Sequence, residues 1–173
     1  MEAVTAYLGL GSNLGQRREN LERAARLLFA SKFIQPLRSS SIYETAPWGY
    51  ADQPDFLNMV LEVHTTLPPG SLLEKVKGLE QKMGREPGRR FGPRIIDVDI
   101  LLYGELTLDR ADLQIPHPRL HQRAFVLVPL AELAPSLVHP TMGLTMDKLA
   151  GGVEDNGGVK LWGLPLDLTS GVA

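Results

Sequence analysis

Two aspartates that stand two residues apart form the clearest chemical pattern in the chain. Asp97 and Asp99 lie in the run RIIDVDILLY, in which almost every other residue is apolar. Side chains alternate between the faces of a β-strand, so a strand here would place both carboxylates on one face, with Cα atoms about 7 Å apart. Two carboxylates at that spacing can converge on hard cations. The alternative is that both are solubilising residues on a solvent-facing side.

An arginine- and glycine-rich segment precedes these aspartates. Its guanidinium groups belong to Arg85, Arg89, Arg90 and Arg94. Arginine binds phosphate in a bidentate manner and glycine permits large backbone movements, so the segment suits a polyphosphate that must be gripped during transfer. An ordinary solvated basic loop is the competing interpretation. Glu80, on or beside the apolar face of the preceding helix, adds weight because an inward-pointing acid needs an arginine or a ligand as its partner.

A second basic cluster lies in the run PHPRLHQRAF. It contains His117, Arg119, His121 and Arg123. Two histidines four residues apart could bind a metal on a helix, but the prolines on both sides of His117 make a helix there improbable. His117 and Arg123 are therefore candidate hydrogen-bond donors to phosphate.

Three aromatic residues lie beside expected loops rather than within secondary-structure elements. They are Trp48, Phe56 and Phe125. A flat heterocycle could stack between two such rings. Packing in the core is the alternative for any one of them.

The elements that must position these residues follow from hydrophobic periodicity. We expect strands at 3–10, 37–45, 56–65 and 94–103, a helix at about 16–30, a second helix from Pro68 and Pro69, and a short helical piece within 122–134. The order β-α-β-β-α-β predicts an α+β fold, a ferredoxin-like βαββαβ sandwich with additional C-terminal elements.

The run GLGSNLG superficially resembles a dinucleotide-binding fingerprint. Leu14 stands where the third glycine of that fingerprint would fall, and the element order is not a repeated βαβ unit. We expect instead that Gly9 and Gly11 let the chain turn closely beside a ligand, and that Ser12 and Asn13 cap the following helix.

The composition of the chain argues against several kinds of partner and site. The 173 residues carry a net charge of −2 and no cysteine. We therefore expect no nucleic-acid partner, disulfide or thiolate metal site. An uncharged apolar run of about 18 residues, long enough to span a bilayer, is absent. These features predict a cytoplasmic monomer without a membrane partner. Residues 1–150 are expected to form one catalytic domain, with 151–173 as a loosely attached tail without chemistry of its own.

Several separated motifs give the chain a family resemblance. FGPRIIDVDILLYG resembles the signature of the 6-hydroxymethyl-7,8-dihydropterin pyrophosphokinases. LGLGSNLG, YETAPWGYADQPDFLN, LEQKMGR and IPHPRLHQRAFVLVPLAELAP extend the likeness over most of the chain, in the family's order.

The resemblance implies a pyrophosphokinase of folate biosynthesis, with ATP and 6-hydroxymethyl-7,8-dihydropterin as its substrates. Asp97 and Asp99 would hold two magnesium ions. The residues implied to bind ATP are Glu80, Arg85, Arg90, Arg94, Ile100, His117 and Arg123. Those implied to bind the pterin are Thr45, Pro47, Trp48, Phe56, Asn58 and Phe125.

The implied reaction is in-line attack of the pterin hydroxymethyl oxygen on the β-phosphorus of ATP, with release of AMP. Asp97 and Asp99 would act in catalysis together with Arg85 and Arg94, which would stabilise the transferring group. A phosphotransferase or nucleotidyltransferase of the same fold with another acceptor remains an alternative. A non-enzymatic ligand-binding sandwich would explain the aromatic residues but not the aspartates.

Overall fold

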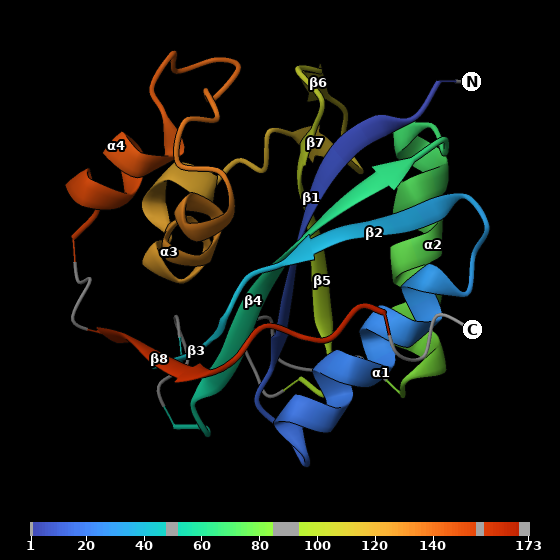
Figure 1. The fold of residues 1–173 in the computed structure, drawn as a ribbon, viewed down its shortest axis with the longest axis vertical. Helices are drawn as coiled ribbons and strands as arrows, with labels where there is room; N and C mark the ends of the chain where they lie inside the picture. The colour runs from blue at the N-terminus through green and yellow to red at the C-terminus, as the bar shows by residue number, and fades with distance from the viewer. Residues whose placement is uncertain (1, 48–51, 85–93, 155–157, 170–173) are drawn as a thin grey trace.

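A computed structural model of the chain describes residues 2–47, 52–84, 94–154 and 158–169. Its centre is an antiparallel sheet with the strand order β5-β1-β4-β3-β8, in which β2 also pairs with β4 (Figure 1). The strands are β1 Val4–Ser12, β2 Ile34–Ser39, β3 Ile42–Thr45, β4 Phe56–Thr65, β5 Asp97–Tyr103 and β8 Val159–Gly163. The expected α+β class is confirmed, because the sheet joins two βαβ units through antiparallel neighbours.

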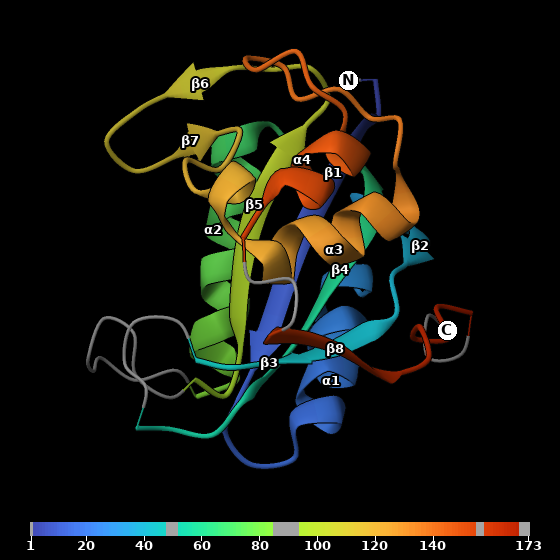
Figure 2. The ribbon, with the colours of Figure 1, turned by 90° about the vertical axis from the view of Figure 1, so that its left-hand side faces the viewer.

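Helices cover both faces of this sheet. Helices α1 (Arg17–Phe29) and α2 (Pro69–Lys82) pack on one face. Helices α3 (Ala124–Leu133) and α4 (Met146–Gly152) pack on the other, together with the 3₁₀ turn η1 (Leu120–Gln122) (Figures 1 and 2). A small hairpin, β6 (Leu108–Asp109) with β7 (Gln114–Ile115), leads into η1. Among the described residues, no helix is long and apolar enough to cross a membrane.

The larger core lies between the sheet and the first two helices. Leu21, Ala24 and Leu28 of α1 recur at helical spacing, and all three are buried. Pro69 begins α2, where its missing N–H leaves no intrahelical hydrogen bond unmade. Both helices lie where hydrophobic periodicity predicts them, because each has one apolar face and the sheet provides an apolar surface to cover it.

Strand β5 alternates as its sequence predicts until a bulge changes its register. Val98 and Ile100 pack into the core on the α1–α2 face, and the aspartates between them point to the opposite face. The register against β1 shifts between Tyr7 and Leu8, so that Leu101 and Leu102 both join the core under α3. The bulge therefore confines strict alternation to the part of β5 that carries the carboxylates.

The expected strand at 37–45 is two strands with a break between them. Ser40, which is fully buried, accepts a hydrogen bond from Val60 N at 2.8 Å through Oγ, and its own N–H donates to Val60 O at 2.9 Å. The serine hydroxyl thus replaces one rung of the ladder, and β3 begins at Ile42 in a new register. Local sequence does not reveal this break because serine fits either conformation.

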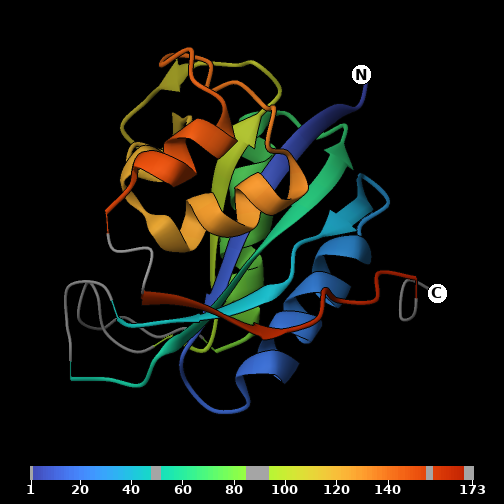
Figure 3. The same ribbon diagram turned by 60° about the vertical axis from the view of Figure 1, so that its left-hand side comes forward.

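The C-terminal segment differs from the expectation of a loosely attached tail. Strand β8 pairs with β3 along its whole length (Figure 3). Beyond it, Leu166 is buried in the α1–α2 core, and its N–H donates to Ser39 Oγ at 3.1 Å. The short, Gly-rich sequence of this segment does not predict the attachment, because the residues that it pairs with are more than 100 positions away in the chain. The division into a domain at 1–150 and a tail at 151–173 stays a prediction.

A polar triad around the buried Glu62 fixes β1, β2 and β4 to one another on the α3 face. Glu62 accepts hydrogen bonds from Tyr7 Oη at 2.5 Å, from Arg38 Nε at 2.8 Å and from Arg38 Nη2 at 3.0 Å. The Arg38 hydrogen bonds hold the pKa of the Glu62 carboxyl below its usual 4.5, although burial opposes them. Burial and the hydrogen bond to Glu62 raise the pKa of Tyr7. Glu62 is therefore ionised and fully hydrogen-bonded in the folded protein.

Replacement of the Glu62 carboxylate should make the free energy of unfolding depend less on pH. We expect Glu62→Gln to lower the free energy of unfolding at pH 7 by about 2 kcal/mol, because charged hydrogen bonds in a buried network are lost. The native carboxylate contributes this stability above about pH 4.5 and loses it as the pH falls through the lower pKa of the folded state. Urea unfolding from pH 7 to pH 3 measures both effects, with exposed Glu74→Gln as the control. Parallel pH profiles for the wild type and Glu62→Gln would contradict the assignment.

Candidate active site

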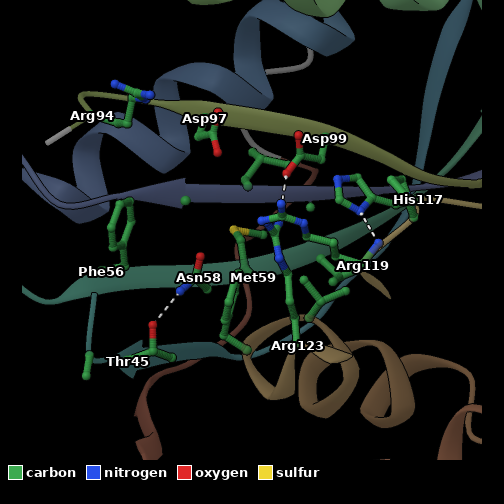
Figure 4. Close-up of a pocket in the computed structure, with 18 residues that line it drawn as sticks. Thr45, Phe56, Asn58, Met59, Arg94, Asp97, Asp99, His117, Arg119 and Arg123 are labelled. Carbon is green, nitrogen blue, oxygen red and sulfur yellow. Dashed lines mark hydrogen bonds and ion pairs between the residues drawn. The ribbon is translucent and has the colours of Figure 1, made fainter. Parts of the chain in front are cut away.

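A cavity of about 340 Å³ opens on the α3 face of the sheet. Strands β1, β3, β4 and β5 line it from below, and residues 117–119 and the start of α3 line it from the side (Figure 4). This volume is within the range of small-molecule sites.

Two glycines form the floor between the functional side chains. Gly11 pairs with Asp97 of β5 on one side and with Asn58 of β4 on the other, and Gly9 pairs in the same way with Asp99 and Val60. A Cβ atom at Gly11 would lie 2.7 Å from Asn58 Oδ1, which is closer than van der Waals contact. Both glycines lie inside β1, so the expectation of a turn at this point is wrong. Their function in the fold is to leave space above the strand.

Carboxylates and cationic groups meet on the β5 side of the cavity, which we call its charged end. Asp97 and Asp99 share one face of β5, as their spacing predicts, and both line the cavity with Arg94 (Figure 4). Arg123 Nη1 lies 4.0 Å from Asp99 Oδ2, and its guanidinium lies 5.4 Å from the centre of the Phe125 ring. Burial lowers the pKa of Arg123, and the Asp99 carboxylate opposes that shift. An arginine so placed remains a cation and can meet anionic oxygens.

The same carboxylates fit a magnesium site. Magnesium prefers oxygen ligands and is usually held by one or two carboxylates together with substrate phosphates. Asp97 and Asp99 supply such a pair on one wall of the cavity. Within the described parts of the chain, no group of three or more His, Cys, Asp or Glu residues could hold a metal by itself. The pair suits a cation that arrives with a polyphosphate better than a permanent all-protein site.

His117 projects into this end as a neutral donor. Burial and the nearby Arg123 lower the pKa of its ring to about 4, although Asp97 opposes the shift. Its Nδ1 accepts a hydrogen bond from Arg119 N at 3.1 Å, so the neutral ring carries its proton on Nε2. Its backbone N–H donates to Leu101 O at 3.0 Å and fixes the segment to β5. The histidine can therefore donate one hydrogen bond without adding charge.

The side of the cavity toward β3 and β4, which we call its aromatic end, carries a phenyl ring, a hydroxyl and an amide. Phe56, Thr45 and Asn58 lie there (Figure 4), and Phe125 lines the same cavity beside Arg123. Asn58 Nδ2 donates to Thr45 Oγ1 at 2.7 Å, which fixes the orientation of a largely buried amide. This arrangement offers flat apolar surface and polar groups to the edge of a heterocycle.

Helix α3 is held to strand β3 at its far end. Glu132 accepts hydrogen bonds from Ser41 N at 3.1 Å, from Ser41 Oγ at 2.9 Å and from Tyr43 Oη at 2.7 Å. Burial and this contact raise the pKa of Tyr43. Because Arg123 and Phe125 lie at the first turn of the same helix, the anchor at its last turn fixes their height above the sheet.

Asn13 connects three segments around the cavity instead of capping a helix. Its Nδ2 donates to Gln53 Oε1 at 2.7 Å and to Pro54 O at 2.9 Å. Its Oδ1 accepts from Arg94 N at 2.7 Å, and its own N–H donates to Arg94 O at 3.0 Å. The N-cap of α1 is Gln16, without a side-chain capping bond, so the expectation that Ser12 and Asn13 cap this helix is wrong. Ser12 Oγ instead accepts from Asn20 Nδ2 at 3.1 Å.

Most of the predicted site residues meet in this cavity. The ones that line it are Thr45, Phe56, Asn58, Arg94, Asp97, Asp99, His117, Arg123 and Phe125. Arg85, Arg90 and Trp48 lie outside the described residues. Glu80 lies under β5, where it accepts a hydrogen bond from Val98 N at 2.9 Å, and Ile100 packs in the core below the sheet. Neither of these two lines the cavity, nor does Pro47, and their predicted roles rest on the resemblance alone.

Sequence reasoning placed Gly9 and Gly11 beside a ligand, and both line the cavity floor, although they do so within β1 and not in a turn. It missed one contributor to the site. Arg119 lines the cavity as well, although its basic cluster pointed only to His117 and Arg123.

Comparisons with known proteins agree on one family. A family model described as 7,8-dihydro-6-hydroxymethylpterin-pyrophosphokinase (HPPK) matches residues 7–135. The 2-amino-4-hydroxy-6-hydroxymethyldihydropteridine pyrophosphokinase of Bacillus subtilis is 42% identical over 158 residues, which cover 91% of this chain and 89% of the relative. The protein of the same name from Methylorubrum extorquens is 46% identical over 133 residues, which cover 77% and 84%.

Longer proteins contain the same region as one part. A folic acid synthesis protein of Dictyostelium discoideum is 39% identical over 88% of this chain, but this chain spans only 23% of that protein. The crystal structure of Plasmodium falciparum HPPK-DHPS with pterin and p-hydroxybenzoate superposes with a TM-score of 0.69 at 19% identity, covering 87% of this chain and 42% of that one. At this identity the likeness is evidence of the fold alone.

The state of His117 gives a direct test of the site's electrostatics. Long-range ¹H–¹⁵N NMR should show a ring protonated on Nε2 alone at pH 6.5, with a titration midpoint of about 4 in the ligand-free protein. The unfolded chain takes up this proton near the usual 6.5, so His117 reduces stability as the pH falls from 6.5 toward 4 and not above that range. Inorganic triphosphate should raise the midpoint by adding negative charge. A midpoint above 6 without ligand would contradict the buried, cation-flanked geometry.

Proposed function

This chain belongs to the 7,8-dihydro-6-hydroxymethylpterin-pyrophosphokinase family, and we propose that it transfers pyrophosphate from ATP to 6-hydroxymethyl-7,8-dihydropterin in folate biosynthesis. The products are AMP and the pterin diphosphate. The single observation that carries the proposal is that one cavity joins a carboxylate pair to two phenylalanine rings. A triphosphate and a flat acceptor need those two kinds of surface side by side.

The aromatic end is assigned to the pterin. Phe56 and Phe125 would stack on its two faces, since both rings line the same cavity. Asn58 and Thr45 would meet the polar edge, with their mutual hydrogen bond fixing the amide. Pro47 and Trp48 are assigned to the same subsite on the family resemblance alone.

The charged end is assigned to the triphosphate. Arg94, Arg123 and neutral His117 would donate hydrogen bonds to its oxygens, because all three line the cavity beside the aspartates. Arg85 and Arg90 are proposed to add further contacts to the transferring group. Glu80 and Ile100 keep their proposed place at the nucleotide from the resemblance.

The proposed chemistry is a single in-line displacement. The hydroxymethyl oxygen of the pterin forms a bond to the β-phosphorus, the bond between that phosphorus and the α–β bridging oxygen breaks, and AMP leaves with the bond's electron pair. The hydroxyl proton passes to solvent or to a neighbouring carboxylate. Arg94 and Arg123 would stabilise the negative charge on the transferring group.

The carboxylate pair is proposed to hold two magnesium ions with ATP. Bound magnesium neutralises phosphate charge and lowers the pKa of oxygens that it contacts. Asp97 and Asp99 would hold the ions in place at the wall of the cavity. ATP is the co-substrate, and a cytoplasmic monomer that needs no macromolecular partner stays our prediction.

The reaction is tested by the nucleotide that it releases. Incubation with ATP, magnesium and 6-hydroxymethyl-7,8-dihydropterin should form AMP and pterin diphosphate in equal amounts, measured by chromatography. EDTA should stop turnover, since the polyphosphate charge is then unneutralised. Formation of ADP would indicate transfer of one phosphoryl group and contradict the proposal. Magnesium-dependent nucleotide binding without any turnover would favour an enzyme with another acceptor.

Loss of one aspartate should impair the phosphate end of the cavity and leave pterin binding unchanged. We expect Asp97→Ala to reduce kcat on the order of 100- to 1,000-fold, because ions at the phosphates lose a ligand. Pterin binding to the nucleotide-free protein, measured by calorimetry, should stay within about twofold because the stacking residues are untouched. The matched control is Asp112→Ala, at a surface residue whose Oδ1 lies 3.4 Å from Arg110 Nε. Near-normal activity of Asp97→Ala would overturn the metal assignment.

A further inference from the structure

Strand β3 depends on a strand from the C-terminal segment. It has four residues and reaches β4 through three pairs, Tyr43 with Asn58, Glu44 with Leu57 and Thr45 with Phe56. The pairs at its two ends include residues that line the cavity, so displacement of β3 would displace the aromatic end. Strand β8 pairs with the other edge of β3, from Ile42 through Thr45 (Figure 3). Without β8, this four-residue strand would be the edge of the sheet, where strands are the least restrained.

A series of side-chain contacts connects β8 to the same end of the cavity. The guanidinium of Arg17 lies 5.9 Å from the centre of the Trp162 ring. Arg17 Nη1 donates to Glu44 Oε2 of β3 at 2.8 Å and to Asp55 O at 3.0 Å. Asp55 directly precedes Phe56. Trp162 therefore lies over an arginine side chain that joins β3 to the start of β4.

The segment that provides these contacts lies beyond the family match. The matched residues end at 135, whereas β8 covers Val159–Gly163. Trp162 is 43% exposed and belongs to neither of the two hydrophobic cores. Its position over Arg17 is better explained by the contacts that Arg17 makes with Glu44 and Asp55 than by packing in the core.

We propose that β8 is a positioning element for the heterocycle end of the cavity, and that Trp162 acts there through Arg17 on β3 and Phe56. The proposal rests on the assignment of that end to the pterin. By pairing with β3 and shielding the Arg17 contacts from water, β8 keeps Thr45, Asn58 and Phe56 in the geometry that stacks and orients the acceptor. Most of the phosphate end does not depend on β3, because Asp97 and Asp99 lie on β5, which pairs with β1, and the His117 segment is held to β5 through its backbone N–H. The two substrates should therefore respond differently to changes in β8.

The first test compares two exposed apolar side chains. Trp162→Ala removes the group over Arg17, and Leu164→Ala removes a 78% exposed side chain just after β8. Calorimetry would measure 6-hydroxymethyl-7,8-dihydropterin binding in the presence of saturating magnesium and α,β-methylene-ATP, whose α–β linkage cannot be cleaved. We expect Trp162→Ala to raise the Kd of the pterin about three- to fivefold, the size of one cation–π contact, and to leave the Kd of the nucleotide analogue unchanged. Leu164→Ala should change neither.

A second pair of variants separates positioning from stability. A chain that ends at Gly158 lacks β8 and also the buried Leu166, and Leu166→Ala damages the same core while keeping β8. We expect the shortened chain to weaken pterin binding and raise the KM of the pterin at least about tenfold, with the Kd of the nucleotide analogue within about twofold. Leu166→Ala should lower the Tm without this selective loss. If the shortened chain does not fold, the Trp162→Ala comparison decides.

The outcomes distinguish this inference from the proposed function. A wild-type protein that neither binds the pterin nor forms AMP would refute the function itself. A wild-type enzyme with normal turnover, whose Trp162→Ala variant binds the pterin unchanged, would refute the role of β8. Equal loss of pterin and nucleotide affinity in step with a lower Tm would also refute it, because that result describes a general loss of folding.

Discussion

The register of three adjacent strands is the constraint on which the site depends. Strand β1 lies between β5 and β4, and its two glycines stand in line with the aspartates of β5 and with Asn58 and Val60 of β4. Neighbouring strands lie about 4.8 Å apart, so Asp97 and Asn58 are separated by two strand spacings, or roughly 10 Å. The missing side chains of β1 turn that separation into open space. A shift of one residue between β1 and β5 would turn the aspartates into the core below the sheet, and the same shift between β1 and β4 would turn Asn58 there.

The electrostatic character of the cavity follows from the same placement. Two carboxylates would repel a polyphosphate, but Arg94, Arg119 and Arg123 line the same space. Burial beside these cations keeps the His117 ring neutral, and it raises the cost of any charge that is not matched. A triphosphate that carries magnesium satisfies both sets of groups, since its oxygens meet the arginines and its cation meets the aspartates. Neither partner alone would satisfy both sets.

Local patterns in the sequence predict the elements that carry the site but not every connection between them. The alternation of Leu57, Met59, Leu61 and Val63 predicts β4 with the bounds that the structure has, because these four side chains form the face of the strand that packs on the α1–α2 core. The paired aspartates are predicted on one face for the same reason. The break at Ser40, the bridging role of Asn13 and the attachment of β8 depend on partners far away in the chain, and periodicity contains no information about them. The family resemblance adds the nucleotide roles of Glu80 and Ile100, which no local pattern supplies.

Helix α3 shows how the two ends of the cavity are kept in register with each other. Its first turn carries Phe125, which lines the cavity, and Arg123, just before it, lies 4.0 Å from Asp99, so one helix positions a residue proposed for each substrate. Its last turn is fixed to the start of β3 through Glu132. Strand β3 is in turn paired with β4, which carries Phe56 and Asn58. Any movement that lifts α3 from the sheet must therefore break charged hydrogen bonds at β3 and also separate the two phenylalanine rings. Phe125, proposed for the acceptor, and Arg123, proposed for the phosphates, are consequently positioned by one anchored helix.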